Sequence, residues 1–340
     1  MKKVTLQEIA NSLGISRTTV WKVFSGHEGV SDSLRTRVIA KAQELGYAIP
    51  EDFQYPSSAE ETTPVNIAVA VCRPETSIFW MTIIHQIAKV FSTHNVNLVY
   101  TYLPTSADKT YFLPPTLTNG NVHGIIVLNV YNERLLRLLA ETQIPKVFLD
   151  TSSLVSPDEL NGDLLLMESR NSVRNITAHL LEKGCTLPGF MGDIGYAQSN
   201  RERYEGFCQA LMDAGKTPNP SLCLTTPFGI DSYREEIDSF LSSLSRMPDA
   251  FVCASDYVAC ILMQLLEKRG LRVPEDVAVS GFDNNIEDLL AENLTTVQVF
   301  NEELGSRLAL QILYRIKYPH TPHEVTYLES KVLYRASTGD

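Results

Sequence analysis

The sequence has 340 residues, of which 44% are hydrophobic and 20% are charged, and it carries a formal net charge of −11 at pH 7. A chain of this length is expected to form two or three domains, and its composition excludes a disordered protein. The N-terminal run MKKVTLQEIA lacks the apolar region of a signal peptide. No apolar run approaches the ~20 residues of a membrane helix. We therefore expect a cytoplasmic protein that has no membrane partner.

The acidic charge is unevenly distributed along the chain. Residues 1–49 contain seven Lys and Arg against four Asp and Glu, so this segment carries +3 and the remainder carries −14. The net charge taken as a whole argues against a nucleic-acid-binding protein. However, attraction to phosphates is local and is screened beyond about 10 Å, so a basic N-terminal segment on an acidic body can still bind DNA.

The first 25 residues predict two short helices joined by a tight turn. The first helix has an apolar stripe with helical spacing, formed by Leu6, Ile9, Ala10 and Leu13. Thr5 and Glu8, three residues apart, form the pattern of a capping box at its start. Gly14 supplies the backbone freedom for the turn, and Ser16 can cap the second helix.

The second helix has an apolar inner face and a polar, cationic outer face. Its inner face consists of Val20, Val23 and Phe24, and its outer face consists of Arg17, Thr18, Trp21, Lys22 and Ser25. A third helix over 31–45, whose inner side is expected to carry Leu34, Val38, Ala42 and Leu45, completes a small core and ends at Gly46. Two helices with a short turn and a cationic outer face fit a DNA major groove. A helical hairpin whose charged face is only solvated remains the alternative.

The runs VTLQEIANSLGISRTTVWKVFSG and VSDSLRTRVIAKAQELGY resemble, without gaps, the headpiece of the lactose/galactose-repressor (LacI/GalR) family. The resemblance implies an all-α helix-turn-helix headpiece over residues 1–49. We expect Arg17, Thr18 and Lys22 to read base edges, with Arg and Lys favouring guanine. Trp21 stands where the family usually has a small residue, so it would contact a thymine methyl group or the sugar-phosphate backbone. The expected phosphate contacts are Thr5, Ser16, Thr19 and Ser25.

Residues 50–64 predict a linker of unusual composition. The segment 48–64, AIPEDFQYPSSAEETTP, contains three prolines and four acidic residues. In the family that the headpiece resembles, a basic hinge helix at this place inserts a leucine into the minor groove. Here Pro50 disfavours a helix, and Glu51 and Asp52 would lie badly against phosphate. We therefore expect a tether and little bending of the operator.

From residue 65 onward the pattern predicts alternating strands and helices. A first series of strands is expected at 65–72, 97–103, 124–129 and 146–150, and a second series at 163–167, 187–192, 250–254 and 277–282. The alternation predicts an α/β core of two doubly wound parallel sheets. Ligands of such sheets bind outside the carboxyl ends of the strands, and two facing lobes can close on a small molecule.

The family resemblance continues through the core in the runs ERYEGFCQALMDAG, RVPEDVAVSGFDN, NLTTVQ and RAST. It implies that the core, residues 65–340, consists of two periplasmic-binding-protein-like lobes. The implied crossings lie near residues 165, 294 and 322. The N-lobe would then comprise about 65–165 and 295–322, and the C-lobe about 166–294 and 323–340.

Five core residues are candidates for binding an effector. By resemblance, Arg203 in RYEGF would donate to effector hydroxyls or a carboxylate, and Asp283 in GFDN would accept from sugar hydroxyls. Asp150 ends a predicted strand, and the aromatic pair Phe79 and Trp80 could stack on a sugar or a base. Each has a structural alternative, because Arg203 could lie on a helix surface, Asp283 could cap a helix, and the aromatic rings could be core.

Several positions differ from the family pattern. The usual Asp-Asn before a long helix is Glu168-Ser169, and the usual Ala-Asn-Asp is Ala254-Ser255-Asp256, which removes an amide. Cys260 replaces a glycine. We therefore expect that the pocket does not hold the family's commonest sugars in the usual way.

An enzyme and a solute-binding protein are the two alternatives to a DNA-binding regulator. No nucleophile elbow, Walker loop or metal-ligand spacing indicates an enzyme, so we expect neither a metal nor a cofactor. The six cysteines are scattered and predict buried, reduced thiols. A solute-binding protein would lack the headpiece and would carry a signal peptide.

We interpret the chain as a homodimeric transcriptional repressor. It would bind a pseudo-palindromic double-stranded operator, and its affinity for that operator would change with a small-molecule effector, a sugar or related metabolite, between the lobes. A cytoplasmic small-molecule receptor, or a regulator controlled by a protein partner rather than a sugar, remains the alternative.

Overall fold

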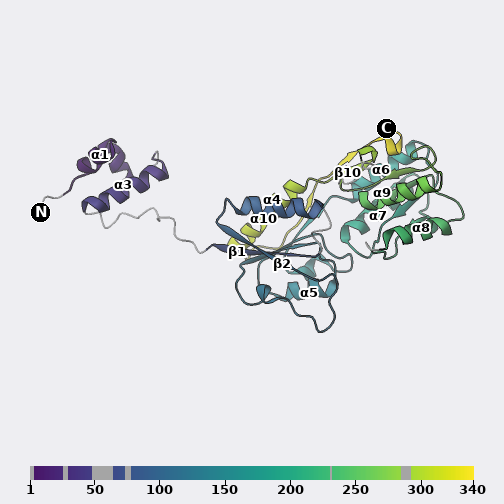
Figure 1. Cartoon of the computed structure of the whole chain (residues 1–340), viewed down its shortest axis with the longest axis horizontal. Coiled ribbons are helices and arrows are strands. Elements are labelled where there is room, and N and C mark those ends of the chain that lie inside the picture. The colour runs from purple at the N-terminus through teal and green to yellow at the C-terminus, as the bar shows by residue number, and fades with distance from the viewer. Residues whose placement is uncertain (1–3, 26–29, 48–63, 73–77, 230–231, 285–291) are drawn as a thin grey trace. The chain divides into compact units, whose positions relative to one another are not determined.

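The computed structural model describes residues 4–25, 30–47, 64–72, 78–229, 232–284 and 292–340. They belong to two units, Met1–Thr63 and Pro64–Asp340, which we describe separately (Figure 1). The predicted linker, including Pro50, Glu51 and Asp52, lies almost entirely outside the described residues. Among the helices in the described part of the chain, none combines the length and apolarity needed to cross a bilayer.

The N-terminal unit is a three-helix headpiece with α1 (Leu6–Leu13), α2 (Arg17–Phe24) and α3 (Asp32–Leu45). Its core consists of Ile9, Ala10, Val20, Val23, Val38, Ile39 and Ala42. The expected capping box of Thr5 and Glu8 is present, and Gly14 has the left-handed φ of 66° that the turn between α1 and α2 requires. Leu45, expected on the inner side of α3, is instead 36% exposed.

The first lobe contains a six-stranded parallel sheet. Its order is β11 (Val325–Leu328), β5 (Asp163–Met167), β4 (Lys146–Leu149), β3 (Gly124–Leu128), β1 (Val65–Val71) and β2 (Val96–Tyr102). Helices α4 (Ile78–Phe91) and α10 (Asn301–Lys317) cover one face, and α5 (Glu133–Glu141) covers the other (Figure 1). The two-residue period of a strand explains this, because Ile67 and Val69 pack with α4 while Ala68 and Ala70 pack with α5.

The second lobe contains a four-stranded parallel sheet. Its order is β7 (Cys223–Leu224), β6 (Pro188–Met191), β8 (Ala250–Cys253) and β9 (Ala278–Ser280). Helices α6 (Arg170–Glu182) and α7 (Gln198–Asp213) pack on one face, and α8 (Tyr233–Ser243) and α9 (Asp256–Lys268) pack on the other. Short 3-10 helices occur at Pro115–Leu117, Pro157–Leu160, Pro220–Leu222 and Ala336–Thr338.

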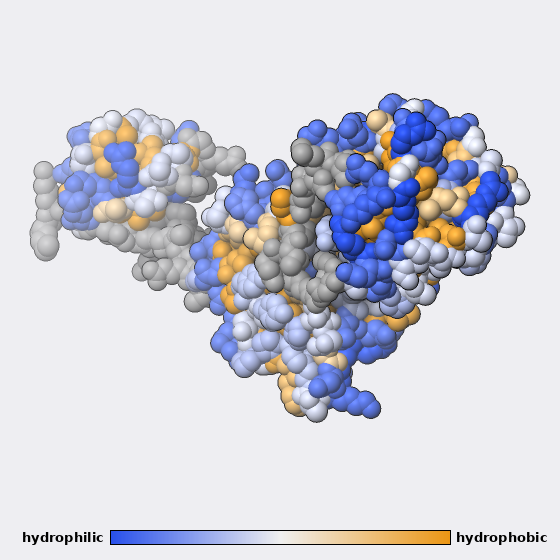
Figure 2. Space-filling model, turned by 45° about the vertical axis from the view of Figure 1, so that its right-hand side comes forward, coloured by the Kyte–Doolittle hydropathy of each residue, from blue (hydrophilic) through white to orange (hydrophobic). Residues whose placement is uncertain are grey.

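Hydrophilic residues cover most of the face shown in Figure 2.

The crossings between the lobes lie a few residues later than expected. The strand β5, predicted to open the second series, instead belongs to the first sheet, where Val147 pairs with Asp163 and Val325 pairs with Leu164. The first crossing therefore follows β5, the second follows β10 (Thr296–Gln298), and the third follows β11 rather than residue 322. The strand β10 pairs antiparallel with β12 (Lys331–Leu333).

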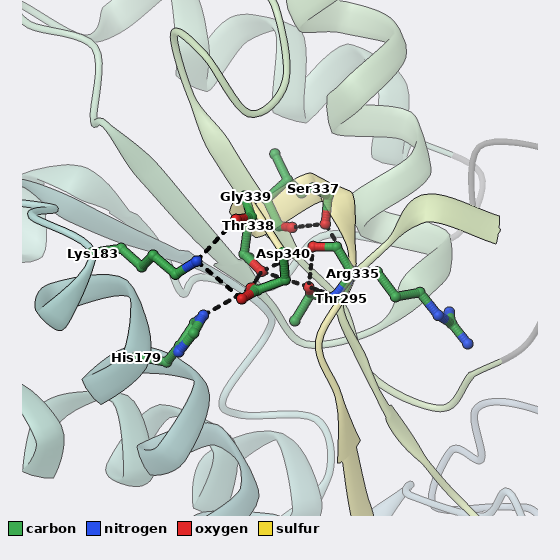
Figure 3. A network of polar contacts seen from close by, with 9 residues as sticks. His179, Lys183, Thr295, Arg335, Ser337, Thr338, Gly339 and Asp340 are labelled. Carbon is green, nitrogen blue, oxygen red and sulfur yellow. Dashed lines mark hydrogen bonds and ion pairs between the residues drawn. The ribbon is translucent and has the colours of Figure 1, made fainter.

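The C-terminal segment is held on the second lobe by a polar network (Figure 3). The Asp340 carboxylate lies 2.8 Å from His179 Nε2 and 3.0 Å from Lys183 Nζ, both on α6. Ser337 Oγ donates to Val279 O and accepts from Thr295 N–H. The RAST motif therefore anchors the last turn of the chain against β9 and the start of β10.

Of the six cysteines, none forms a disulfide. Cys72, Cys223, Cys253 and Cys260 are buried as expected, whereas Cys185 and Cys208 are only half-buried.

Candidate functional sites

The outer face of α2 presents the residues predicted to contact DNA. Arg17, Thr18 and Ser25 are exposed, Trp21 is 46% exposed, and Lys22 is half-buried. This helix face is therefore accessible, and its positive charge suits a major groove.

Three of the four predicted phosphate contacts, Thr5, Ser16 and Thr19, lie at the starts of the first two helices, whereas Ser25 is the C-cap of α2. Ser16 Oγ accepts from Thr19 N–H at 3.0 Å, and Thr5 Oγ1 accepts from Glu8 N–H at 3.4 Å. Helix N-termini also attract anions through their N–H groups. Arg35 Nη1, in contrast, donates to Val23 O at 3.3 Å, so this arginine also fixes α3 against the end of α2.

The Asp150 carboxylate joins the two lobes. Asp150 follows β4 in the first lobe and is 2% exposed. Its Oδ2 accepts from Ser199 Oγ at 2.6 Å, and its Oδ1 accepts from Ser199 N–H at 3.3 Å, both in the first turn of α7. Tyr131 OH donates to the same carboxylate at 3.4 Å. Burial raises the pKa of Asp150, while the hydrogen bonds from Ser199 oppose that rise.

Arg203 and Asp283 face one another in the second lobe. Arg203 Nη2 lies 3.7 Å from Asp283 Oδ1, and Nη1 donates to Ala254 O. The guanidinium carbon lies 3.6 Å from the centroid of the Phe282 ring, in a cation–π contact. Arg203 is 4% exposed, and its Nε has no hydrogen-bond partner among the described residues.

Burial is the main influence on the pKa of Asp283. It raises the pKa of this carboxyl group to about 6, and the positive charge of Arg203 only partly opposes that rise. The group therefore titrates near neutral pH. Asp150 and Asp283 also have positive φ angles of 62° and 106°. Non-glycine residues in such conformations cluster at ligand sites.

The three polar candidates lie close together, although more than 130 residues separate Asp150 from Asp283. The charges of Asp150, Arg203 and Asp283 all act on the Tyr131 hydroxyl, whose pKa is raised well above its ordinary value chiefly by burial. We call Asp150, Arg203, Asp283 and Tyr131 the interlobe cluster.

The aromatic candidates lie elsewhere among the described contacts. Phe79 is 8% exposed and belongs to the hydrophobic core of the first lobe. Trp80 packs edge-on against it, with ring centroids 5.0 Å apart. Neither ring makes a described contact with the interlobe cluster. Phe79 therefore occupies the core position that was the alternative to ligand binding. A ligand contact by either ring stays a prediction.

Sequence reasoning missed several residues that connect the lobes. Tyr196 packs against Tyr131 with the rings tilted by 46° and their centroids 4.4 Å apart. Gln198 N–H donates to Thr151 O at 2.8 Å, and Tyr327 OH donates to Glu202 Oε1 at 2.7 Å. Ser199 in the first turn of α7 and Tyr131 after β3 also contact Asp150. Each lies near the end of a strand, but no feature of the sequence predicts that the two residues meet at one carboxylate.

Two of the residues that differ from the family pattern cap helices, whereas Ser169 makes no side-chain capping hydrogen bond and Cys260 lies inside α9. Glu168 accepts from the N–H groups of Asn171 at 2.6 Å and Ser172 at 3.0 Å, at the start of α6. Ser255 Oγ accepts from Val258 N–H at 3.3 Å at the start of α9. Glu168 and Ser255 therefore supply helix caps.

Comparison with known proteins shows which families the chain is similar to. A model of bacterial regulatory proteins of the lacI family matches residues 5–50, and a model of a periplasmic binding protein-like domain matches residues 177–338. The transcriptional repressor PurR of Aliivibrio salmonicida is 26% identical over 340 residues, which cover 98% of each chain. The chain belongs to the LacI family. It is a DNA-binding transcriptional repressor and not an enzyme.

Other known proteins are similar to the chain in sequence or in fold. The ribose operon repressor of Haemophilus influenzae is 25% identical, with 98% of each chain covered. The regulator CelR, solved with cellobiose, is 24% identical with a TM-score of 0.69 and covers 98% of this chain and 100% of its own. The lac repressor dimer, solved on its operator, is 22% identical with a TM-score of 0.67 and covers 99% of each chain. These two structures confirm the expected two-lobed fold.

Proposed function

We propose that this LacI-family repressor acts as a homodimer on a pseudo-palindromic operator and that a polyhydroxylated small molecule binds at the interlobe cluster. The observation that carries the proposal is the convergence of Asp150, Arg203 and Asp283 where the lobes meet. Carboxylates accept from hydroxyl groups and a guanidinium donates to them. The names of the relatives, one a ribose operon repressor and one solved with cellobiose, agree with this chemistry.

Two unpartnered polar atoms support a polar ligand at this place. Arg203 Nε and Thr151 Oγ1 are buried without a hydrogen-bond partner among the described residues. A buried polar group without a partner costs about 1–3 kcal/mol, and a ligand hydroxyl would remove that cost. We assign Asp150 and Asp283 as acceptors and Arg203 as the donor.

In the headpiece, which we assign to residues 1–49, α2 enters the major groove. Arg17, Thr18 and Lys22 read base edges, and Trp21 contacts a thymine methyl group or the backbone. The hydroxyl groups of Thr5, Ser16, Thr19 and Ser25 bind phosphates. Residues 50–64 tether the headpiece to the core. A repressor acts on the chromosome, so the proposal places the protein in the cytoplasm.

Effector binding would act through lobe closure. Arg203 lies on α7 one turn after Ser199, which contacts Asp150, so a ligand at the cluster changes the contacts between the lobes. A ligand that prefers one arrangement of the lobes shifts the population toward it. In a dimer this movement changes the spacing of the two headpieces and therefore the operator affinity.

The effector class is tested by a thermal-shift screen of sugars, nucleosides and phosphorylated metabolites, followed by fluorescence anisotropy on a selected operator. Arg203→Gln should abolish the change in operator affinity that the effector causes, while operator binding without effector stays within about threefold. Arg170→Gln, an exposed arginine paired with Glu205, is the control and should respond as the wild type does. Full response by the Arg203 variant would refute the assignment.

A further inference from the structure

A pocket lies where the three crossing segments meet. Its lining consists of Met167, Val299, Phe300, Glu303, Leu304, Leu328, Glu329 and Ser330, and its volume is about 180 Å³. These residues come from the end of β5, the segment after β10, the first turn of α10, and the end of β11 with the segment that follows it. The pocket shares no residue with the interlobe cluster.

The floor of the pocket is apolar. Met167, Val299 and Leu304 are at most 5% exposed, and Leu328 is half-buried beside them. Phe300 stands at the rim with 43% of its surface exposed. A concave site with apolar walls and a few polar groups is typical of small-molecule binding. The volume is below the roughly 300–1,000 Å³ of drug-sized sites, so a fitting molecule has one ring or a short chain.

The polar groups of the pocket are predominantly negative. Glu303 and Glu329 are exposed, and neither carboxylate has a hydrogen bond or ion pair with another described residue. No Lys or Arg lines the pocket. A cation is therefore attracted by two carboxylates, and the exposed Phe300 ring adds a cation–π partner.

We propose that this pocket is a second ligand site, which binds a small organic cation with an apolar body. The apolar body packs on Met167, Val299 and Leu304, and the ammonium group faces Glu303 and Glu329. Because all three crossing segments line the pocket, an occupant stabilises the arrangement of the lobes in which the pocket has this shape. This regulatory consequence rests on the proposed function, whereas the binding itself does not.

The test uses full-length protein labelled with ¹³C in its methionine methyl groups. The chain has seven methionines, and Met167→Leu identifies the signal of Met167. Benzylamine is the probe, and benzyl alcohol is the neutral molecule of matched shape. We expect benzylamine to shift the Met167 signal in a saturable way, with an affinity at least about tenfold higher than that of benzyl alcohol.

Removing the negative charges of Glu303 and Glu329 should weaken binding as much as replacing benzylamine by the neutral benzyl alcohol does. The double variant Glu303→Gln with Glu329→Gln should bind benzylamine at least about tenfold more weakly. The control with an equal charge change, Glu302→Gln with Glu235→Gln, should bind as the wild type does, and thermal unfolding verifies that both variants fold.

Two results would overturn the site: an unmoved Met167 signal at 50 mM benzylamine, or equal affinities for the amine and the alcohol. A separate anisotropy titration on operator DNA tests the regulatory consequence. A Met167 shift with unchanged operator affinity would refute the regulation and leave the site standing. Failure of operator binding itself would concern only the proposed function.

Discussion

The Asp283 carboxyl group changes its charge close to neutral pH. Burial raises its pKa to about 6, from an ordinary value near 4. Between these two values the folded protein binds more protons at this site than the unfolded chain does. The contribution of Asp283 to folding stability is therefore fully present below about pH 4 and is lost as the pH rises through 6.

Asp283→Asn should remove this pH dependence. Because asparagine resembles the neutral acid, the free energy of unfolding of the variant relative to wild type should rise between pH 4 and pH 7, by up to roughly 3 kcal/mol. Urea unfolding of both proteins at several pH values measures the difference between their free energies of unfolding. The contributions of the other carboxyl groups are the same in both proteins and cancel in this difference. A constant difference across this range would contradict a raised pKa at Asp283.

Lys22 is the second residue whose contribution can be isolated. It lies near the end of α2, half-buried on the face that carries Arg17 and Trp21. Lys22→Ala should cost about 1–3 kcal/mol of operator binding and relax specificity at one base position. Selection from randomised oligonucleotides measures both effects. Lys41→Ala is the control, because Lys41 pairs with Glu44 at 2.8 Å on α3, and an unchanged sequence preference in the Lys22 variant would refute base reading.

At the scale of elements, a buried ion pair holds α10 against the first sheet. Arg315 Nη2 lies 2.5 Å from Asp163 Oδ1, and both side chains are at most 2% exposed. Gln311 Nε2 donates to the same carboxylate at 2.8 Å, and Glu324 N–H donates to it at 2.9 Å. One carboxylate therefore connects β5, α10 and the residue that precedes β11.

Asp163→Asn should destabilise the core strongly. The substitution leaves the Arg315 guanidinium buried without a counter-charge, and breaking a buried pair in this way costs about 3–5 kcal/mol. Calorimetric unfolding of the full chain measures the effect. Glu302→Gln, on the exposed side of the same helix, should change the unfolding temperature little. A similar small change in the Asp163 variant would show that the pair is not needed to hold α10.

The elements also show how far the sequence could predict the fold. Strands β1 and β5 lie within one residue of their predicted ends, because long apolar runs bounded by polar residues define them. The assignment of β5 to the second series was wrong, since an apolar strand does not encode which sheet it joins. The strand β11 was missed because its residues alternate between exposed and half-buried and give only a weak pattern.

The same limit applies to the interlobe cluster. Asp150, Arg203 and Asp283 could be predicted, because each lies in a motif or at a strand end. Their partners Tyr131 and Ser199 could not, because contact across the lobes depends on the packing of both sheets and not on spacing along the chain.

At the scale of the whole molecule, the sequence divides into a basic headpiece and an acidic core. The first 49 residues carry +3 and the remainder carries −14. Non-specific DNA is attracted by the first and repelled by the second, so operator affinity should depend mainly on the headpieces and their spacing. If effector binding moves the lobes as proposed, residues 50–64 must convert that movement into a change of headpiece spacing.

This arrangement predicts a measurable coupling between effector and operator. If lobe closure changes headpiece spacing, the sugar that binds best in the thermal-shift screen should change operator affinity by roughly 5–150-fold, corresponding to about 1–3 kcal/mol. The operator must then change the affinity for that sugar by the same factor, which isothermal titration with and without operator DNA measures. Asp150→Asn should reduce the factor, because it weakens the carboxylate that joins β4 to α7. A sugar affinity that is the same with and without operator would mean that the lobes and the headpieces act independently.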